Sequence, residues 1–201
     1  HEIMTKHFPM ISQAAKLTGA KAIQNRGTIG GNICNASPAG DTPPALLSYD
    51  AEVELSSVDG IRWVSYDEFH LDYKKTNLKP NELLTRVKLK IPSENVSSYY
   101  HKVGTRNALA ISKVCFAGLV ETEDQLITKA RLSWGSMAPF PVRTKRVEEL
   151  ITNKSISSLD QQEIHDLLAV ELKPIDDIRS TAKYRITVAK NILSHFLTKE
   201  I

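Results

Sequence analysis

Two glycine-containing runs near the N-terminus carry the residue types best suited to chemistry. They are Arg26-Gly27-Thr28-Ile29-Gly30-Gly31-Asn32 and Asn35-Ala36-Ser37-Pro38-Ala39-Gly40-Asp41. Paired glycines have no Cβ atoms, so a ligand can lie directly against the backbone. The N–H groups of such a turn form a concavity suited to a phosphate or pyrophosphate. Thr28, Asn32 and Asp41 add a hydroxyl, an amide and a carboxylate. The stretch therefore predicts a site for a pyrophosphate-bearing ligand, and a purely structural glycine-rich turn is the alternative interpretation.

Other motifs with chemical meaning are missing from the sequence. It contains no G-x-x-x-x-G-K-[ST], no G-x-G-x-x-G and no G-x-S-x-G, which are typical of nucleoside triphosphatases, Rossmann folds and α/β-hydrolases. The six histidines form no H-x-x-x-H pair, so a zinc site has little support. Cys34 and Cys115 are too few for an iron–sulfur cluster, which takes four ligands. We expect no metal site and no catalytic acid or base, so redox chemistry would need a borrowed cofactor.

The composition is that of a soluble globular protein. The chain has 201 residues, of which 41% are hydrophobic and 24% charged, which excludes intrinsic disorder. No apolar run approaches the ~18 residues of a membrane span, and no leader segment opens the chain, so we expect no membrane contact and a cytoplasmic location. The net charge is only +3, too small to form a basic stripe for nucleic acid.

The hydrophobic pattern divides the chain into two α+β units. Apolar residues near a 3.6-residue period predict a helix over residues 7–19. Period-2 alternation predicts a hairpin of residues 51–56 and 61–64 around Asp59-Gly60, and a further strand over residues 87–91. The polar stretch 93–98 is the best candidate for a boundary, which places the units at residues 1–95 and 96–201.

The second unit reads as a meander followed by helices. Strands are expected over residues 99–105, 112–121 and 127–136, with a turn at residues 122–125. After Pro139 and Pro141 the pattern becomes helical. Ser158 and Gln161 suggest a capping box, and apolar residues over 186–197 predict a final amphipathic helix.

Several spaced motifs together resemble one known family. The run T-I-G-G-N-x-x-x-A-S-P-x-x-D-x-x-P, preceded by Q-N-R-G, is similar to the FAD-binding subunit of molybdenum hydroxylases. This family includes the flavin subunit of xanthine dehydrogenase and the medium subunit of carbon monoxide dehydrogenase. The resemblance continues in Pro80-Asn81-Glu82-Leu83-Leu84, in Tyr100-His101-Lys102-Val103-Gly104-Thr105-Arg106 and in Tyr184-Arg185, so it covers essentially the whole chain.

The resemblance implies a fold and a set of cofactor-binding residues. Residues 1–95 resemble the second subdomain of the family's FAD-binding domain, and residues 96–201 resemble its C-terminal domain, a small antiparallel sheet with helices. The residues aligned with FAD contacts are Thr28, Ile29, Gly30, Gly31, Asn32, Asp41, Leu84 and Lys102. Leu84 aligns with an apolar residue near the flavin ring. An ammonium at Lys102 would favour negative charge on the reduced flavin; without the alignment, Lys102 reads as a surface lysine on a strand.

The resemblance also implies a place in a larger enzyme. A molybdopterin-binding large subunit would hydroxylate the substrate, a [2Fe–2S] small subunit would pass electrons to FAD, and NAD or another acceptor would remove them. Family members begin with a further subdomain that carries an A-G-G-T-like phosphate loop, which this sequence does not match. We therefore interpret the chain as a fragment with half of the FAD site and a reduced flavin affinity. A cofactor-free module for subunit contacts, and a phosphate or nucleotide binder that does not use flavin, are the alternatives.

Overall fold

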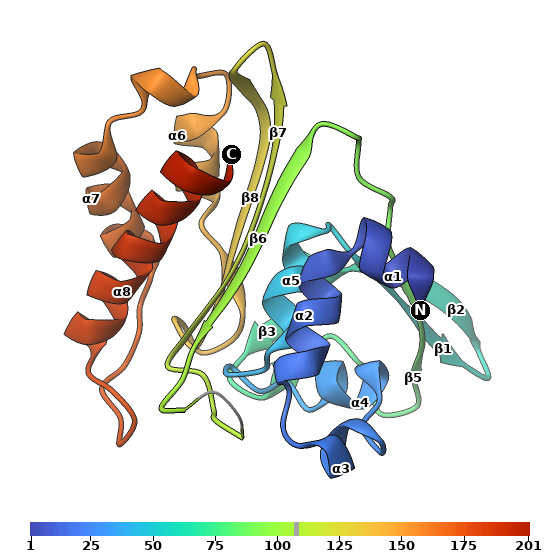
Figure 1. Cartoon of the computed structure of the whole chain (residues 1–201). Helices are drawn as coiled ribbons and strands as arrows, with labels where there is room; N and C mark the ends of the chain where they lie inside the picture. Colours follow the sequence, from blue (N-terminus) through green and yellow to red (C-terminus); the bar gives the residue numbers. More distant parts are fainter. Residues whose placement is uncertain (107–108) are drawn as a thin grey trace.

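Two larger antiparallel sheets, one two-stranded sheet and two groups of helices make up the computed structural model of the chain, which describes residues 1–106 and 109–201. Figure 1 shows the C-terminal helices on one side, a long twisted sheet in the middle, and the N-terminal helices with a smaller sheet on the other side. This mixed arrangement of helices and small antiparallel sheets confirms the predicted α+β class.

Five short helices precede the first sheet. They are α1 (Glu2–His7), α2 (Pro9–Leu17), α3 (Lys21–Gln24), α4 (Ile29–Cys34) and α5 (Thr42–Ser48). The helix predicted over residues 7–19 corresponds to α2. It begins at Pro9, whose ring presets a helical φ and whose missing N–H is not needed in a first turn. α4 occupies the position where the sequence predicts a turn, so the glycine pair lies in a helix.

The first sheet has three antiparallel strands in the order β2-β1-β5. Their bounds are β1 (Glu52–Ser57), β2 (Gly60–Ser65) and β5 (Leu83–Lys88). The β1–β2 hairpin confirms the prediction, and Gly60 supplies its positive φ of 142°. The strand predicted over 87–91 is wrong at both ends, because pairing with β1 begins at Leu83 and stops at Lys88. The sequence analysis also missed the short elements η1 (Tyr66–Glu68), β3 (His70–Asp72) and β4 (Lys75–Thr76).

The second sheet is the predicted meander with one short strand added. It has the order β6-β7-β8-β9, with bounds β6 (Val96–Val103), β7 (Val114–Glu123), β8 (Leu126–Gly135) and β9 (Val142–Arg143). The turn between β7 and β8 places Asp124 and Gln125 at φ values of 48° and 66°. Two successive positive φ values match the strand twist of a tight hairpin.

The remaining chain is helical, as predicted. It contains α6 (Lys145–Ile151), η2 (Ile156–Ser158), α7 (Gln161–Glu171), α8 (Ala182–His195) and the π-helical turn η3 (Phe196–Glu200). The predicted capping box of Ser158 and Gln161 is wrong. Asp160 caps α7 instead, because its carboxylate accepts hydrogen bonds from the N–H groups of Gln162 and Glu163.

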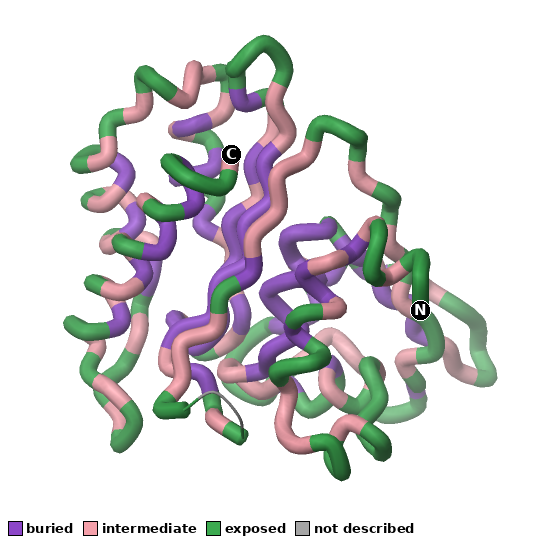
Figure 2. Tube along the Cα trace, viewed as in Figure 1, coloured by how far each residue is buried: buried purple, intermediate pink, exposed green. Residues whose placement is uncertain are grey.

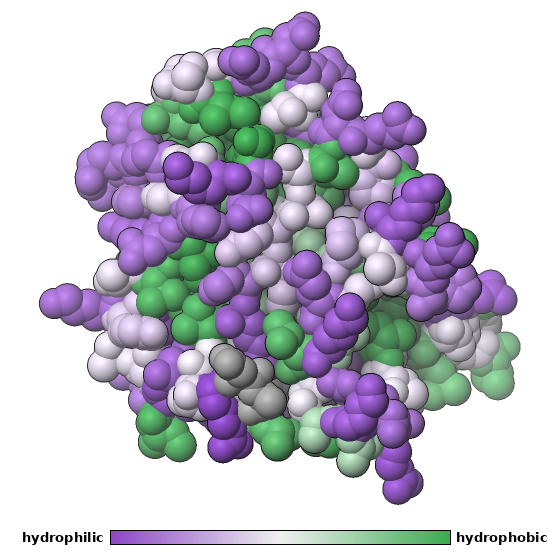
Figure 3. Space-filling model, viewed as in Figure 1, coloured by the Kyte–Doolittle hydropathy of each residue, from purple (hydrophilic) through white to green (hydrophobic). Residues whose placement is uncertain are grey.

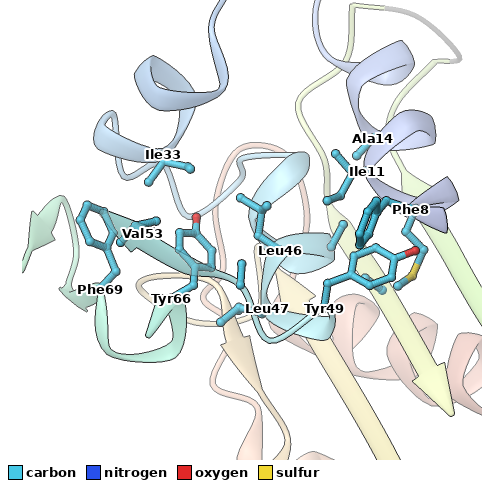
Figure 4. Packing of buried hydrophobic residues seen from close by; sticks show 14 of the residues in the cluster. Phe8, Ile11, Ala14, Ile33, Leu46, Leu47, Tyr49, Val53, Tyr66 and Phe69 are labelled. Atoms are coloured by element: carbon cyan, nitrogen blue, oxygen red, sulfur yellow. The ribbon is translucent and has the colours of Figure 1, made fainter. Parts of the chain in front are cut away.

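The second sheet is covered on both faces, and Figure 2 shows its central strands buried. Alternate residues of β7 belong to two different cores, as the period of a strand requires. Val114 and Phe116 pack with the C-terminal helices, whereas Cys115 and Ala117 pack with α2 and α5. Figure 4 shows the N-terminal core, where side chains of α2 and α5 meet those of the first sheet and η1. The two predicted units therefore share a sheet, and their division at residue 95 stays a prediction.

Candidate functional site

The glycine-rich run begins a helix rather than a loop. Thr28 is the N-cap of α4, with extended backbone, and its hydroxyl accepts a hydrogen bond of 3.0 Å from the N–H of Gly31. The first N–H groups of any helix have no partner within the helix, so capping leaves some of them available. The glycine run thus presents backbone donors in the first turn of α4, where the sequence predicts them in a turn.

The two glycines of α4 are there for different reasons. A Cβ placed on Gly31 would lie 3.0 Å from the Thr28 hydroxyl, so the cap itself favours glycine at that position. A Cβ placed on Gly30 would meet its nearest atom, in the Leu84 side chain, at an ordinary 3.7 Å. Glycine within a helix costs about 1 kcal/mol relative to alanine. Packing therefore does not require glycine at position 30, and the half-buried backbone there has no side chain to keep a ligand away.

Asn32 connects α4 to the segment that carries Asp41. The hydroxyl of Thr42, the residue after Asp41, donates a 2.6 Å hydrogen bond to the Asn32 side-chain oxygen. Leu84 lies beside Gly30 on the other side, from strand β5. Ile29 begins α4 and is 42% exposed. The residues predicted in the first unit therefore lie in α4 or next to it, and Asn32 bonds the residue that follows Asp41.

Lys102 joins this group from the second unit. Its ammonium lies 2.8 Å from a carboxylate oxygen of Asp41 and 3.0 Å from the carbonyl oxygen of Leu17, at the end of α2. The Lys102 and Asp41 side chains are only 7% and 9% exposed. Lys102 is therefore a buried member of an ion pair. Burial raises the pKa of the Asp41 carboxyl, against the lowering effect of the Lys102 ammonium.

One oxygen of Asp41 has no partner in the described part of the chain. Its Oδ1 atom is buried and accepts no hydrogen bond there, and the Thr18 hydroxyl donates to the Ala14 carbonyl instead. A buried carboxylate oxygen without a donor is costly. A ligand hydroxyl could donate the hydrogen bond that this carboxylate oxygen lacks.

Two positioning residues were missed in the sequence analysis. Leu17 acts through its backbone carbonyl, which has no sequence signal. The Tyr100 hydroxyl donates a 2.9 Å hydrogen bond to the Asp41 carbonyl and lies 3.1 Å from Cys115 Sγ. Tyr100 and Lys102 belong to the same motif and are two residues apart in β6, so they lie on the same face of the strand. Alternation along β6 could therefore have indicated that both side chains point toward the N-terminal core. Burial raises the pKa of the Cys115 thiol to about 12, so this sulfur is a packing group.

A cavity of about 500 Å³ lies next to Lys102. Its lining includes Leu17 and the run from His101 to Arg106. Within residues 1–106 and 109–201, no three His, Cys, Asp or Glu side chains are placed to hold a metal ion. No helix among these residues combines the length and apolar character needed to cross a bilayer.

Two family models together match nearly the whole chain. A profile described as "FAD binding domain in molybdopterin dehydrogenase" matches residues 1–93. A second, "CO dehydrogenase flavoprotein C-terminal domain", matches residues 98–199. The chain belongs to the FAD-binding subunits of the molybdenum hydroxylases. The resemblance noted in the sequence is therefore confirmed, and FAD is the cofactor of the family.

Curated relatives and solved structures agree with this membership. The xanthine dehydrogenase FAD-binding subunit of Escherichia coli O157:H7 is 28% identical over 197 residues, which cover 96% of this chain and 68% of the relative. The nicotinate dehydrogenase FAD-subunit of Eubacterium barkeri is 31% identical over 78% of this chain and 54% of the relative. A carbon monoxide dehydrogenase structure from Hydrogenophaga pseudoflava has a TM-score of 0.93 at 24% identity, covering 100% of this chain and 69% of that one, which shows the shared fold.

The residues present fit an FAD molecule. The orphaned Asp41 oxygen can accept a hydrogen bond from a ligand hydroxyl, and the half-buried backbone of Gly30 leaves room for a group that a side chain would obstruct. An ammonium has three N–H donors, and Lys102 uses two of them within the protein. A dinucleotide with phosphates, hydroxyls and a polar ring offers partners for each of these features.

Proposed function

We propose that this chain holds part of the FAD site of a molybdenum hydroxylase and tunes the bound flavin. FAD would accept electrons from the [2Fe–2S] clusters of a small subunit and deliver them to NAD or another acceptor. A molybdopterin-binding large subunit would hydroxylate the substrate and select it. The family membership supports the cofactor, and the site geometry supports the share of the work assigned to this chain.

Gly30 is the observation that carries the proposal. The structure has room for a Cβ at this position, and the helix would gain stability from one, yet the residue is glycine. A glycine that packing does not require suggests that a ligand approaches the backbone closely at this position. The first turn of α4, with Thr28, Ile29, Gly31 and Asn32, would then hold the phosphates.

Asp41 and Lys102 would act on other parts of the cofactor. Asp41 would accept a hydrogen bond from a cofactor hydroxyl through its free oxygen, while its other oxygen holds Lys102. Lys102 would direct its third N–H toward the flavin. Because Asp41 already balances its charge, the lysine would act mainly as an oriented donor rather than as a free cation. Leu84 would supply an apolar contact from β5.

Substitution of Gly30 by alanine tests the proposal. Gly30→Ala should fold normally and bind FAD about 10–100-fold more weakly, since crowding by one methyl group costs roughly 1–3 kcal/mol. Flavin absorbance retained after desalting, together with an FAD titration, measures binding, and circular dichroism checks the fold. The binding and circular dichroism measurements are made on this chain and on any longer subunit that contains it. Ala189→Gly, in the buried face of α8, is a control for altered stability without any change at the site.

The outcomes separate the alternatives. Unchanged FAD binding by a folded Gly30→Ala variant in the longer subunit would contradict the role given to α4. Binding by the longer subunit but not by this chain would leave the chain as a cofactor-free module until it is completed. Binding of a simple nucleotide in preference to FAD would favour a phosphate site that does not use flavin.

A further inference from the structure

A second cavity is lined by none of the residues assigned to FAD. It has a volume of about 490 Å³ and is formed between the β3–β4 hairpin and the segment that precedes α8. Its walls are mostly apolar and include Pro38, Ala39, Tyr73, Ala138, Pro139 and Ile175. Several segments far apart in sequence thus build one hollow. None of the predicted FAD contacts lines it, although Pro38 and Ala39 belong to the run that ends at Asp41.

The edge of this cavity is a rigid turn held by Asp177. The Asp177 carboxylate accepts hydrogen bonds from the N–H groups of Arg179 and Ser180 and from the Arg185 guanidinium. Desolvation acts to raise the pKa of this carboxyl, but these donors lower it overall to about 2. Backbone bonds between Asp177 and Ser180 close the turn. Side-chain and backbone hydrogen bonds therefore both stabilise this turn.

The turn presents an isoleucine entirely to solvent. Ile178, between two residues that line the cavity, is 100% exposed, and Ile175 is 69% exposed. Across the cavity, Tyr73 on the β3–β4 hairpin is 63% exposed. Figure 3 shows hydrophobic atoms at the lower edge of the molecule, where the loop before α8 lies. Large apolar side chains held rigidly around a hollow are typical of protein contact sites.

The charge around the cavity is positive. Lys173, Arg179 and Arg185 line it together with a single carboxylate, Asp177, which forms ion pairs with both arginines, at 3.1 Å to Arg179 and 2.8 Å to Arg185. Arg185 is buried and bonded within the protein, whereas the exposed Lys173 side chain has no ion pair among the described residues. The adjacent Asp176 also carries a negative charge, and its carboxylate accepts a hydrogen bond from the N–H of Ala182 at the start of α8. The unpaired Lys173 and the surplus of cations over carboxylates in the lining therefore favour an acidic partner.

We infer that this surface, made of Tyr73, Lys173, Ile175, Ile178 and Arg179 around the cavity, docks an acidic segment of another protein. The segment would insert an apolar side chain into the cavity, cover Ile178, and place carboxylates against Lys173 and Arg179. This contact goes beyond the proposed FAD site and does not depend on it.

A second copy of this chain is a poorer occupant. In a two-fold symmetric contact the same patch meets itself. Lys173 and Arg179 of both copies would then face each other, and juxtaposed like charges oppose association. A small ligand is also a poorer fit, because Ile178 stands outside the cavity mouth and would stay exposed.

Photo-crosslinking in the native host tests the inference. A benzoylphenylalanine replaces Ile178 in the tagged full-length protein, or replaces Ile61 as the control. Ile61 is also exposed, at 64%, but lies on β2 in the other sheet. After irradiation, the crosslinked peptide is identified by mass spectrometry. The expected adduct, formed from position 178 and not from 61, is with a segment of another protein that has Asp or Glu flanking an apolar residue.

Charge reversal supplies the second measurement. Lys173→Glu should reduce the yield of this adduct at least tenfold, whereas Lys199→Glu, an exposed lysine in η3, should leave it unchanged. Circular dichroism of both variants checks that the fold is intact. An adduct with this same chain, an adduct with a basic or uncharged segment, no adduct at position 178, or an unchanged yield in Lys173→Glu would each overturn the inference.

Discussion

The ammonium of Lys102 lies 2.8 Å from the carboxylate of Asp41, 61 residues earlier in the chain. The pair joins β6 of the second sheet to the start of α5, and the ammonium also donates a hydrogen bond to the Leu17 carbonyl at the end of α2. Both side chains are more than nine-tenths buried. The pair therefore fixes the relative position of the two segments that would contact the cofactor.

Breaking this pair should be costly. Asp41→Asn or Lys102→Met alone leaves a buried charge without its partner, so each should lower the free energy of unfolding by about 3–5 kcal/mol. The double variant should recover a large part of that loss, because neither charge remains. Urea unfolding of the four proteins gives the coupling energy. Additive losses in the double variant would show that the two side chains do not depend on each other.

Much of the fold could be predicted because its signals are local. The hairpin of β1 and β2 follows from alternation around Asp59-Gly60, and the β6–β8 meander follows from three apolar runs. The end of β5 could not be predicted in this way. Leu89 and Ile91 continue the alternating pattern, but pairing with β1 stops at Lys88, which is a tertiary effect.

The candidate site was predicted as a set of residues without its geometry. Family resemblance located Gly30 and Asp41, but residue type alone could not show that Gly30 is helical or that Asp41 has a free oxygen. The strand pattern alone would predict that Lys102 is a surface lysine. Its burial depends on α2, whose last carbonyl lies 85 residues away in sequence. Contacts of this range leave no local pattern.

Acidification should destabilise the protein through His70. This imidazole is 5% exposed, its Nε2 lies 3.0 Å from the Tyr66 hydroxyl, and its Nδ1 has no partner among the described residues. Burial lowers the pKa of His70 to about 4. The unfolded chain therefore binds the proton more readily, and stability present above pH ~6.5 is lost as the pH falls toward 4, by about 3 kcal/mol in all.

His70→Gln provides the comparison for this pH effect, since glutamine does not titrate and can still bond the Tyr66 hydroxyl. Urea unfolding at intervals from pH 7.5 to 4 should show a steeper decline for the natural protein than for the variant. Parallel curves would mean that His70 is protonated in the folded protein as easily as in the unfolded chain.

Asp50 should contribute a salt-sensitive share of stability. It is bonded to Arg131 at 2.7 Å and lies 3.2 Å from both Lys129 and Arg143, so it links the end of α5 to the second sheet. Burial acts to raise the pKa of Asp50, but these cations, Arg131 first, lower it overall. Asp50→Asn keeps a residue that tolerates the φ of 47°.

Asp50→Asn should lower the free energy of unfolding by about 1 kcal/mol at low salt, because the side chain is partly exposed. The decrease should be smaller in 1 M NaCl. Urea unfolding at both salt concentrations measures it. Asp59→Asn, at the exposed tip of the first hairpin, is the control and should change stability little. An equal loss for Asp50→Asn at both salt concentrations would assign the effect to something other than charge.

Gly118 is required by the packing of the second core. A Cβ at this position in β7 would lie 2.6 Å from the Phe116 ring and 2.7 Å from the Phe196 ring, and both rings are completely buried. Gly118→Ala forces these rings or the strand to move, so the free energy of unfolding should fall by about 2–3 kcal/mol. Urea unfolding measures the loss. Gly30→Ala is the matched control, since its Cβ has room and should not destabilise the helix. A Gly118→Ala protein as stable as the natural one would show that the sheet and η3 can separate at no cost, contrary to the close contact of Phe196 with β7.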